Sequence, residues 1–255
     1  MQIVILGSGT STGVPVIGCH CQVCSSGDPR NRRTRSSALI RTDGTDGRNI
    51  LIDTSTDLRL QSLANGVERI DAVLFTHPHA DHIHGIDDLR TFNAIQNSAI
   101  PCFGNEYTIE RIRRAFEYIF NGDGADGWKP NLTATVVDSP FEIFGVEIVP
   151  VEISHGPATI LGWRIGKAAY VTDCNSIPAA SLERLMGVEV LIVGALRFKP
   201  HPTHFNIEQA IEAAVAVKAA RTVFTHLGHN LDYGRDKDAL PPGMEFAYDG
   251  MRIGI

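Results

Sequence analysis

Short runs of apolar, mostly β-branched residues alternate with polar and glycine-containing segments along this chain of 255 residues. Runs that are bounded by turn-forming residues are typical of buried strands. We therefore expect strands over residues 3–6, 37–41, 49–52, 72–75, 147–153, 168–171, 188–193 and 222–224. Several of these runs end at a polar residue, and strands that end in this way bring reactive side chains to one edge of a sheet.

Three longer stretches, residues 87–97, 107–120 and 207–220, space their apolar residues with the period of a helix. The last stretch follows Asn206, and Asn206 with Gln209 fits a capping box at its start. The expected strands and helices are mixed, without strict alternation. This order predicts an α+β protein in which sheets pack together and helices lie outside them.

Composition is typical of a globular enzyme, with 43% hydrophobic and 20% charged residues. We find no linker-like or low-complexity block, so we expect one domain over residues 1–255. The net charge of −6 argues against binding of long nucleic acid, which needs a broad basic surface, and favours a small-molecule substrate. One basic stretch stands apart, and it could either meet phosphate or tie down nearby backbone: Arg30, Arg32, Arg33 and Arg35.

The chain starts with an apolar run too short for a signal peptide, and no run approaches the ~18 apolar residues of a membrane span. We therefore expect a cytoplasmic protein without membrane contact. Residues 7–13 are rich in glycine, serine and threonine but match neither common nucleotide-binding motif. We interpret this segment as a turn near the functional site, with phosphate binding as the alternative.

A cluster of potential metal ligands follows the expected strand 72–75, namely His77, His79, Asp81 and His82. Several imidazoles and a carboxylate cannot all be buried without partners, because each carries polar atoms that must be satisfied. A metal ion supplies such a partner, and this donor set suits zinc, manganese or iron. Two adjacent metals are possible, because the loop changes direction within the motif.

Further ligands are expected where other strands end. His155, Asp173 and His226 each follow a predicted apolar strand. Together with the first cluster they supply enough donors for two metal ions, which can activate water and stabilise charge on a phosphoryl group.

A second cluster contains Cys19, Cys21 and Cys24. Three thiolates on one loop (residues 19–24) are one ligand short of a closed tetrahedral zinc site. We expect His229 to complete it, because it lies three residues after His226; His20 is the rival ligand, and three reduced cysteines without metal are the alternative. This zinc would be structural.

The full ligand set resembles the signature of the metallo-β-lactamase superfamily, His-x-His-x-Asp-His followed by a distant His, a distant Asp and a last His. The resemblance implies an αββα four-layer sandwich with a dinuclear site at one edge. It implies two ligand trios and a bridging carboxylate: His77, His79 and His155; Asp81, His82 and His226; and Asp173 between them. Asp53, at the end of an early strand, would orient a ligand histidine, with a plain turn carboxylate as the alternative.

The cysteine loop and the segment 240–251 narrow the resemblance to the family of the cyclic phosphodiesterase of the bacterial carbon–phosphorus lyase pathway, the PhnP-like family. That resemblance implies two divalent ions (zinc or manganese) in the active site, one structural zinc, and a homodimer. It also implies a phosphodiesterase for small or cyclic phosphoesters of the 2′,3′-cyclic nucleotide or cyclic ribose phosphate type. A metal-bridging hydroxide would attack phosphorus, and Asp81 would orient it.

Phosphodiester cleavage expels a poor leaving group, so a histidine that titrates near neutrality is a useful proton donor. His204 matches the general-acid histidine of the family, and His201 is the less favoured alternative.

Two other functions stay open. One is a tRNA 3′-end nuclease, although only residues 156–172 separate His155 from Asp173, where that enzyme commonly carries a long arm. The other is a non-catalytic metal-binding accessory protein of cofactor biosynthesis.

Overall fold

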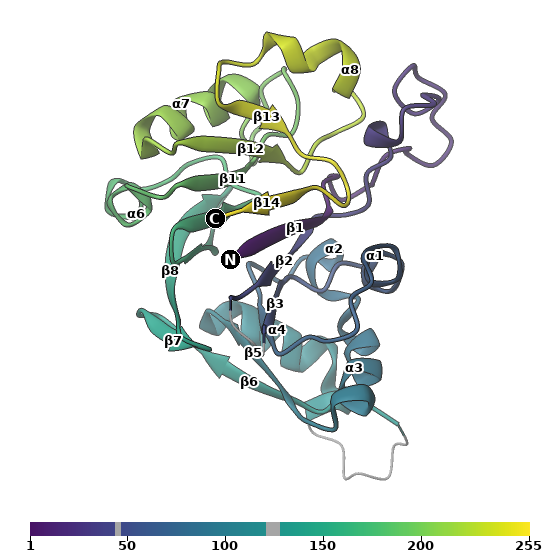
Figure 1. The fold of residues 1–255 in the computed structure, drawn as a ribbon, viewed down its shortest axis with the longest axis vertical. Coiled ribbons are helices and arrows are strands. Elements are labelled where there is room, and N and C mark those ends of the chain that lie inside the picture. The colour runs from purple at the N-terminus through teal and green to yellow at the C-terminus, as the bar shows by residue number, and fades with distance from the viewer. Residues whose placement is uncertain (44–46, 121–127) are drawn as a thin grey trace.

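Two mixed seven-stranded sheets form the centre of the computed structural model, which describes residues 1–43, 47–120 and 128–255 (Figure 1). The first sheet has the strand order β14 (Arg252–Gly254), β1 (Gln2–Gly7), β2 (Ser37–Arg41), β3 (Asn49–Ile52), β4 (Ala72–Leu74), β5 (Ile100–Gly104) and β6 (Leu132–Val136). The second has the order β13 (Met244–Phe246), β12 (Arg221–Thr225), β11 (Val190–Gly194), β10 (Ala168–Val171), β9 (Ala158–Ile165), β8 (Val146–His155) and β7 (Phe141–Ile143).

Helices cover the outer face of each sheet (Figure 1). The α-helices are α1 (Leu58–Asn65), α2 (Ala80–Ile83), α3 (Leu89–Gln96), α4 (Glu106–Ala115), α5 (Glu117–Phe120), α6 (Ala179–Leu185), α7 (Ile207–Val217) and α8 (Tyr233–Asp236). Short 3₁₀ turns lie at Pro29–Asn31, Ile86–Asp88 and Lys237–Ala239. Helices α1, α3 and α4 pack on the first sheet, and α6 and α7 pack on the second. The observed architecture confirms the predicted α+β sandwich with helices outside.

Alternation along each central strand fills three apolar layers. On β1, Ile3 and Ile5 point between the sheets, where they join Trp163, while Val4 and Leu6 point to the helices. Because side chains alternate across a strand, a strand that is buried on both faces must be apolar throughout. This explains why the runs in the sequence are continuous.

All eight predicted strands are present, and the described residues form six others that the pattern did not predict: β5, β6, β7, β9, β13 and β14. β5 contains a proline and a glycine, β6 is largely exposed, and β7, β13 and β14 are only three residues long. β9 carries Gly162 where a Cβ would approach the carbonyl oxygen of Tyr170 to 3.2 Å. Close packing therefore requires glycine at this position, and a glycine within the run weakens the sequence pattern that predicts a strand.

The predicted helices are present with changed bounds. Residues 86–88 form a 3₁₀ turn before α3, and the stretch 107–120 divides at Phe116 into α4 and α5. Helix α7 begins with the predicted capping box, in which Gln209 N donates to Asn206 Oδ1 at 2.9 Å. It ends at Val217, because Lys218 adopts the left-handed conformation.

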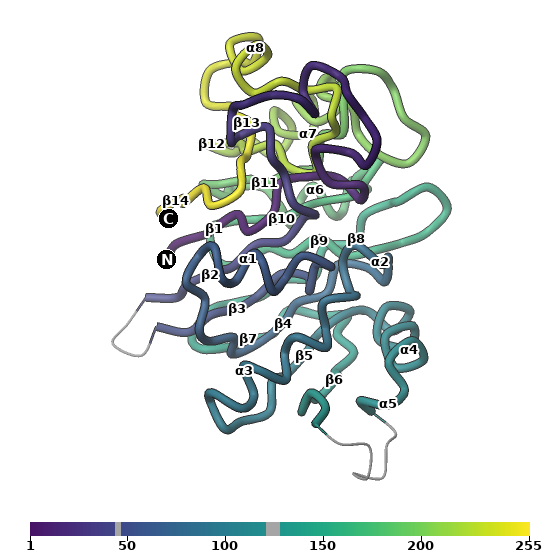
Figure 2. Tube along the Cα trace, turned by 90° about the vertical axis from the view of Figure 1, so that its right-hand side faces the viewer, coloured from purple at the N-terminus to yellow at the C-terminus, as the bar shows by residue number. Residues whose placement is uncertain are grey.

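Figure 2 shows the N-terminal loop, in purple, beside the C-terminal segments near α8. Within the part of the chain that the structure describes, no helix is long and apolar enough to cross a membrane.

Candidate metal centre

Side chains from both sheets meet at one edge of the molecule, where four strands end. Residues 77–82 follow β4 of the first sheet, whereas His155 ends β8, Asp173 follows β10 and His226 follows β12 of the second. Asp173 and His226 have φ of 56° and 57°, a left-handed conformation that residues other than glycine rarely adopt. Backbone strain of this kind is common at functional sites, where the surrounding structure maintains it.

The first predicted trio comes together. The ligand atoms of His77, His79 and His155 lie within 4.8 Å of one another. His77 Nε2 and His79 Nδ1 are 3.0 Å apart. His77 is buried and His79 is exposed, so this trio opens toward solvent, where a substrate can reach it.

The second trio lies deeper. Ligand atoms of Asp81, His82 and His226 also lie within 4.8 Å of one another. Asp81 Oδ2 is 3.2 Å from His82 Nε2 and 3.9 Å from His226 Nε2. Both histidines are almost fully buried, and Asp81 is nearly so.

Asp173 lies between the two trios. Its Oδ2 is 3.3 Å from His82 Nε2, and its Oδ1 is 3.0 Å from His226 Nε2. The same carboxylate also groups with His77 and His82, and with His155 and His204. The Asp173 carboxylate therefore lies close to ligand atoms of both trios.

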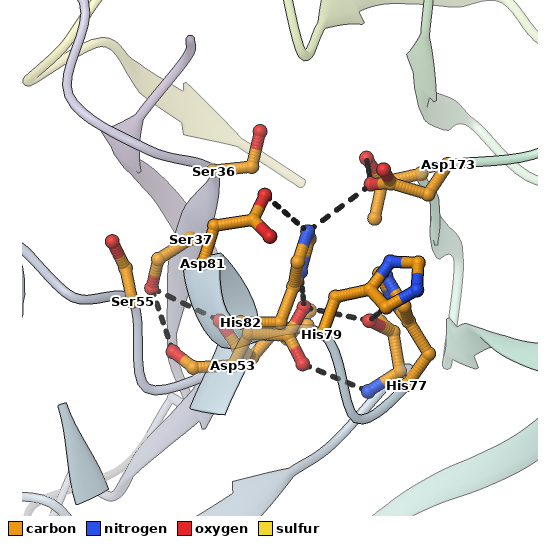
Figure 3. Close-up of polar contacts among 12 residues, drawn as sticks. Ser36, Ser37, Asp53, Ser55, His77, His79, Asp81, His82 and Asp173 are labelled. Atoms are coloured by element: carbon orange, nitrogen blue, oxygen red, sulfur yellow. Dashed lines mark hydrogen bonds and ion pairs between the residues drawn. The ribbon is translucent and has the colours of Figure 1, made fainter. Parts of the chain in front are cut away.

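The ligand histidines are held from behind by other groups. Asp53 is fully buried, and its Oδ2 accepts a hydrogen bond from His82 Nδ1 at 2.7 Å. Thr76 donates to both Asp53 oxygens, through its amide at 2.8 Å and its hydroxyl at 2.7 Å. Figure 3 shows the His82 ring with Asp53 on one side and Asp81 and Asp173 on the other. Asp53 thus fixes the ring so that Nε2 faces the site, which is the contact expected of it.

Two other outer contacts were not predicted. Thr76 Oγ1 lies 3.0 Å from His77 Nδ1, and His155 Nδ1 donates to the carbonyl oxygen of Thr203 at 2.9 Å. Asn175 Oδ1 accepts from the amide of Gly156 at 2.9 Å and holds the turn after His155. Thr76 could have been noticed because it directly precedes His77. A backbone carbonyl such as that of Thr203 carries no sequence signal.

The site has unsatisfied polar atoms of the kind that a cation completes. Among the described residues, His82 Nε2 and His226 Nε2 are buried and form no hydrogen bond, although carboxylate oxygens lie 3.0–3.3 Å away. An unpaired buried nitrogen is costly, and imidazole with carboxylate is a donor set that divalent transition metals accept. The second trio therefore fits a metal ion, and the first trio offers three imidazoles within 4.8 Å of one another, a donor set of the same kind.

Charge in the site favours ionised carboxylates. Burial alone would raise the pKa of Asp173, but the facing rings of His226 and His82 hold it well below its ordinary value. Burial likewise opposes ionisation of Asp81, whose pKa is nevertheless lowered by His82 and His226. Burial lowers the pKa of His77 well below its ordinary value, and His82 adds to this effect. The carboxylates and His77 therefore hold the protonation states that metal ligands require.

His204 lies over the two trios. Its Nδ1 is 3.6 Å from Asp173 Oδ1, and its ring stacks on His226 at 5.0 Å between centroids. His201 is one step further out, with its ring 5.0 Å from that of His204. Burial lowers the pKa of His204 to about 3, and nearby imidazoles contribute. This downward shift runs against the expectation that His204 titrates near neutrality.

The cysteine cluster closes on His229. Its Nδ1 lies 3.3 Å from the sulfur of Cys19, 3.7 Å from that of Cys21 and 3.5 Å from that of Cys24. His20 is exposed and is not part of this group. The Cys24 amide lowers the pKa of Cys21 to about 6, whereas burial raises that of Cys24 to about 11. Three sulfurs and one imidazole nitrogen form a donor set that fits structural zinc.

Three of the four arginines in the basic stretch have structural partners. Arg30 pairs with Asp28, Arg35 pairs with Asp57, and Arg33 is buried against backbone carbonyls.

The glycine-rich segment 7–13 forms the expected turn. The Gly13 amide donates to the carbonyl oxygen of Thr10, and the Thr10 amide donates to that of Leu227, next to His226.

Residues 48–227 match the family model of the β-lactamase superfamily domain. A solved structure described as a new diphosphatase from the PhnP family is 41% identical, with a TM-score of 0.92, over 100% of this chain and 97% of that one. An octanoyltransferase of Porphyromonas gingivalis is 40% identical over 98% of this chain, but the chain spans only 51% of that relative's length. Coenzyme PQQ synthesis protein B of Methylorubrum populi is 30% identical over 75% of this chain and 72% of the relative.

Proposed function

The chain belongs to the metallo-β-lactamase superfamily of metal-dependent hydrolases, and on that premise we propose that it is a phosphodiesterase acting on small or cyclic phosphoesters. One observation carries the proposal: the Asp173 carboxylate contacts His82 and His226 of the second trio and lies within 4.8 Å of ligand atoms of the first, while His204 faces it at 3.6 Å. A hydrolytic centre with a proton donor opposite suits displacement of an alkoxide from phosphorus.

The proposed metal ligands are the seven residues of the two trios and the carboxylate between them: His77, His79, His155, Asp81, His82, His226 and Asp173. When bound, two zinc or manganese ions would acidify a shared water and neutralise charge on a phosphoryl group. Asp81 would also orient the attacking water through its carboxylate. Cys19, Cys21, Cys24 and His229 would hold one structural zinc, and these reduced thiols fit the cytoplasm.

His204 would supply the proton for the leaving oxygen. Its depressed pKa keeps the imidazole neutral before substrate binds. A phosphodiester brings negative charge next to His204, and a nearby opposite charge favours the protonated form. Protonation would therefore follow substrate binding, and the proton would then pass to the oxygen that leaves phosphorus.

Turnover of a substrate panel tests this function. The protein loaded with manganese or zinc is assayed with a 2′,3′-cyclic nucleotide, a bis-aryl phosphate and a diphosphate ester, because the similar PhnP-family protein is described as a diphosphatase. An octanoyl thioester completes the panel, because the longer relative is named an octanoyltransferase. We expect phosphoester hydrolysis; a fully metallated protein that turns over none of the phosphoesters would overturn the proposal.

A tRNA 3′-end nuclease is less well supported. Between His155 and Asp173 the chain forms only β9 and β10, which pair within the second sheet. This segment therefore contains no inserted arm that could bind tRNA. A gel shift at low salt is expected to show no tRNA binding.

An accessory role without catalysis has one supporting observation, the similarity to coenzyme PQQ synthesis protein B. His204 distinguishes the two readings. In an enzyme, His204→Ala strongly lowers turnover and leaves metal content unchanged, whereas in a binding protein it changes neither.

A further inference from the structure

Four consecutive residues connect the two candidate metal sites. His226 belongs to the second trio, and His229 completes the cysteine cluster. Between them, Leu227 forms a bridge with Gly9, and its amide donates to the carbonyl oxygen of Ser8 at 2.9 Å. Because only Leu227 and Gly228 separate the two histidines and Leu227 is fixed by these contacts, we expect a displacement of His229 to move His226.

Arg33 holds this connecting segment. Its Nη1 donates to the carbonyl oxygen of Gly228 at 3.0 Å, and its Nη2 donates to that of Leu231 at 2.9 Å. Nη2 also donates to Asn31 Oδ1 at 2.9 Å, and Asn31 Oδ1 accepts the Tyr233 amide at 2.9 Å. One guanidinium thus brackets the backbone on both sides of His229.

The burial of Arg33 is unusual for a cation. The residue is 1% exposed, and all its recorded hydrogen bonds go to neutral oxygens. Burial accordingly lowers the pKa of Arg33 to about 10. A buried charge without a hydrogen-bonded carboxylate is costly, and a shape-matched apolar side chain would avoid that cost.

The same segment supports the loop that carries His204. The Gly228 amide donates to the carbonyl oxygen of Leu196 at 2.9 Å, and the Leu196 amide donates to that of Phe205 at 3.0 Å. A Cβ on Gly228 would lie 3.0 Å from the Leu196 oxygen, so this approach has no room for a larger residue. The positions of His226 and of Phe205, which follows His204, therefore both depend on the position of Gly228.

From these contacts we propose that Arg33 is a positioning residue that couples the Cys₃His site to the active site, so that zinc at the cysteines raises metal affinity at Asp81, His82 and His226. The proposal rests on the metal assignments of the proposed function and adds a thermodynamic link between the two centres. Such coupling is reciprocal, because thermodynamic linkage requires each metal to change the affinity for the other by the same factor.

Cobalt(II) reports the two sites separately. Thiolate ligation gives an intense near-ultraviolet charge-transfer band, whereas the histidine–carboxylate site gives only weak visible bands. In Arg33→Met we expect chelator competition to show about ten- to hundredfold weaker cobalt binding at the second trio, the range for loss of a group that orients a ligand. Unchanged affinity at the second trio would overturn the proposal.

Two further variants separate bridging from charge and from general loop stability. Arg33→Lys keeps the charge but cannot reach both the Gly228 and Leu231 carbonyls, so we expect it to resemble Arg33→Met. Full rescue by lysine would contradict a bridging role. Arg30→Met is the matched control, because Arg30 lies in the same loop, has a side chain that is 43% exposed, and contacts Asp28 and the ring of Tyr233 but not Gly228. It should bind cobalt as the unmodified protein does.

A measurement on the unmodified protein covers the case in which Arg33→Met fails to fold. A mercurial that binds thiols is titrated against the cobalt-loaded protein, and both absorption bands are followed. We expect stripping of the cysteine site to release cobalt from the second trio at a chelator concentration that the intact protein withstands. Retention of that cobalt after complete loss of the thiolate band would overturn the coupling. Because neither readout involves turnover, a failure here is distinct from a failure to hydrolyse phosphoesters.

Discussion

Three ligand imidazoles of the site are each held by a different kind of group. His82 has the Asp53 carboxylate, His155 the Thr203 carbonyl oxygen, and His77 the Thr76 hydroxyl. Among the described residues, His226 Nδ1 has no such partner. His226 therefore depends on its backbone for orientation, which makes the segment after it important for metal binding.

Asp53 is the strongest of these outer contacts. Replacing it in Asp53→Asn leaves a neutral acceptor behind His82, and we expect metal affinity at the second trio to fall by about ten- to hundredfold. Isothermal titration with manganese measures the change. Asp28→Asn, which removes a surface ion pair with Arg30 at 2.8 Å, should leave the affinity as it is. Equal loss in both variants would refute the specific role of Asp53.

His204 and His201 are the two candidate donors of the proton to the leaving oxygen. We expect His204→Ala to lower kcat for a bis-aryl or cyclic phosphodiester by about 10²–10⁴-fold, the usual contribution of a positioned acid. His201→Ala should cost much less, because His201 lies beyond His204 and bonds to Thr203. Steady-state kinetics at matched metal content measures both. A larger loss in His201→Ala would exchange the two roles.

The sequence predicted the candidate metal ligands well, but it predicted less about the residues that surround them. The residue types and spacing of His77 to His82 indicated metal, because few other arrangements satisfy so many buried donors. The pKa of His204 could not be predicted, since it depends on burial beside His226 and His155, which are distant in the sequence. The Thr203 carbonyl could not be predicted either, because every residue has one.

Strand ends determine where the reactive groups lie. β3, β4, β10 and β12 each deliver a functional residue to the same edge, and Asp53, Asp173 and His226 leave their strands with φ of 60°, 56° and 57°. The apolar runs predicted these four strands. The sharp turns that follow them are not visible in the pattern, because none of the three positions holds the glycine that usually marks a left-handed residue.

The start of α7 links helix stability to the His204 loop. Asn206 caps the helix, and its Nδ2 also donates to the Phe198 carbonyl oxygen at 3.2 Å. We expect Asn206→Ala to lower the free energy of unfolding by about 1–2 kcal/mol, as for other lost caps. Chemical denaturation monitored by circular dichroism measures this. Gln209→Ala, which removes only the returning half of the capping box, should cost less; the reverse order would contradict the capping account.

The whole molecule is needed to make the site, because the first sheet supplies residues 77–82 and the second supplies His155, Asp173 and His226. The apolar layer between the sheets sets their separation, with Trp163, Tyr170 and Ile192 among its buried members. Sequence patterns predicted that sheets would pack together. They did not predict which edge strands pair, since β13 and β14 are too short to produce a periodic signal.

Asp249 joins distant parts of the chain and should make stability depend on pH. Its oxygens accept hydrogen bonds from Ser8 and Thr34, while burial raises its pKa above the ordinary value. Above pH ~4 the unfolded chain has lost this proton whereas the folded protein still holds it, so this carboxyl's contribution to stability falls as pH rises through the folded pKa. Asp249→Asn should remove that slope. Denaturation from pH 4 to 7 measures the difference, and parallel profiles for the two proteins would contradict it.

Metal-dependent turnover tests the central claim most directly. Metal-free protein, with its Cys₃His site first filled by one equivalent of zinc, is titrated with manganese while hydrolysis of a bis-aryl phosphate is followed. The account predicts that activity rises until two further equivalents are bound per chain and then stays constant. Full activity after a single further equivalent, or no hydrolysis after two, would contradict a dinuclear phosphodiesterase.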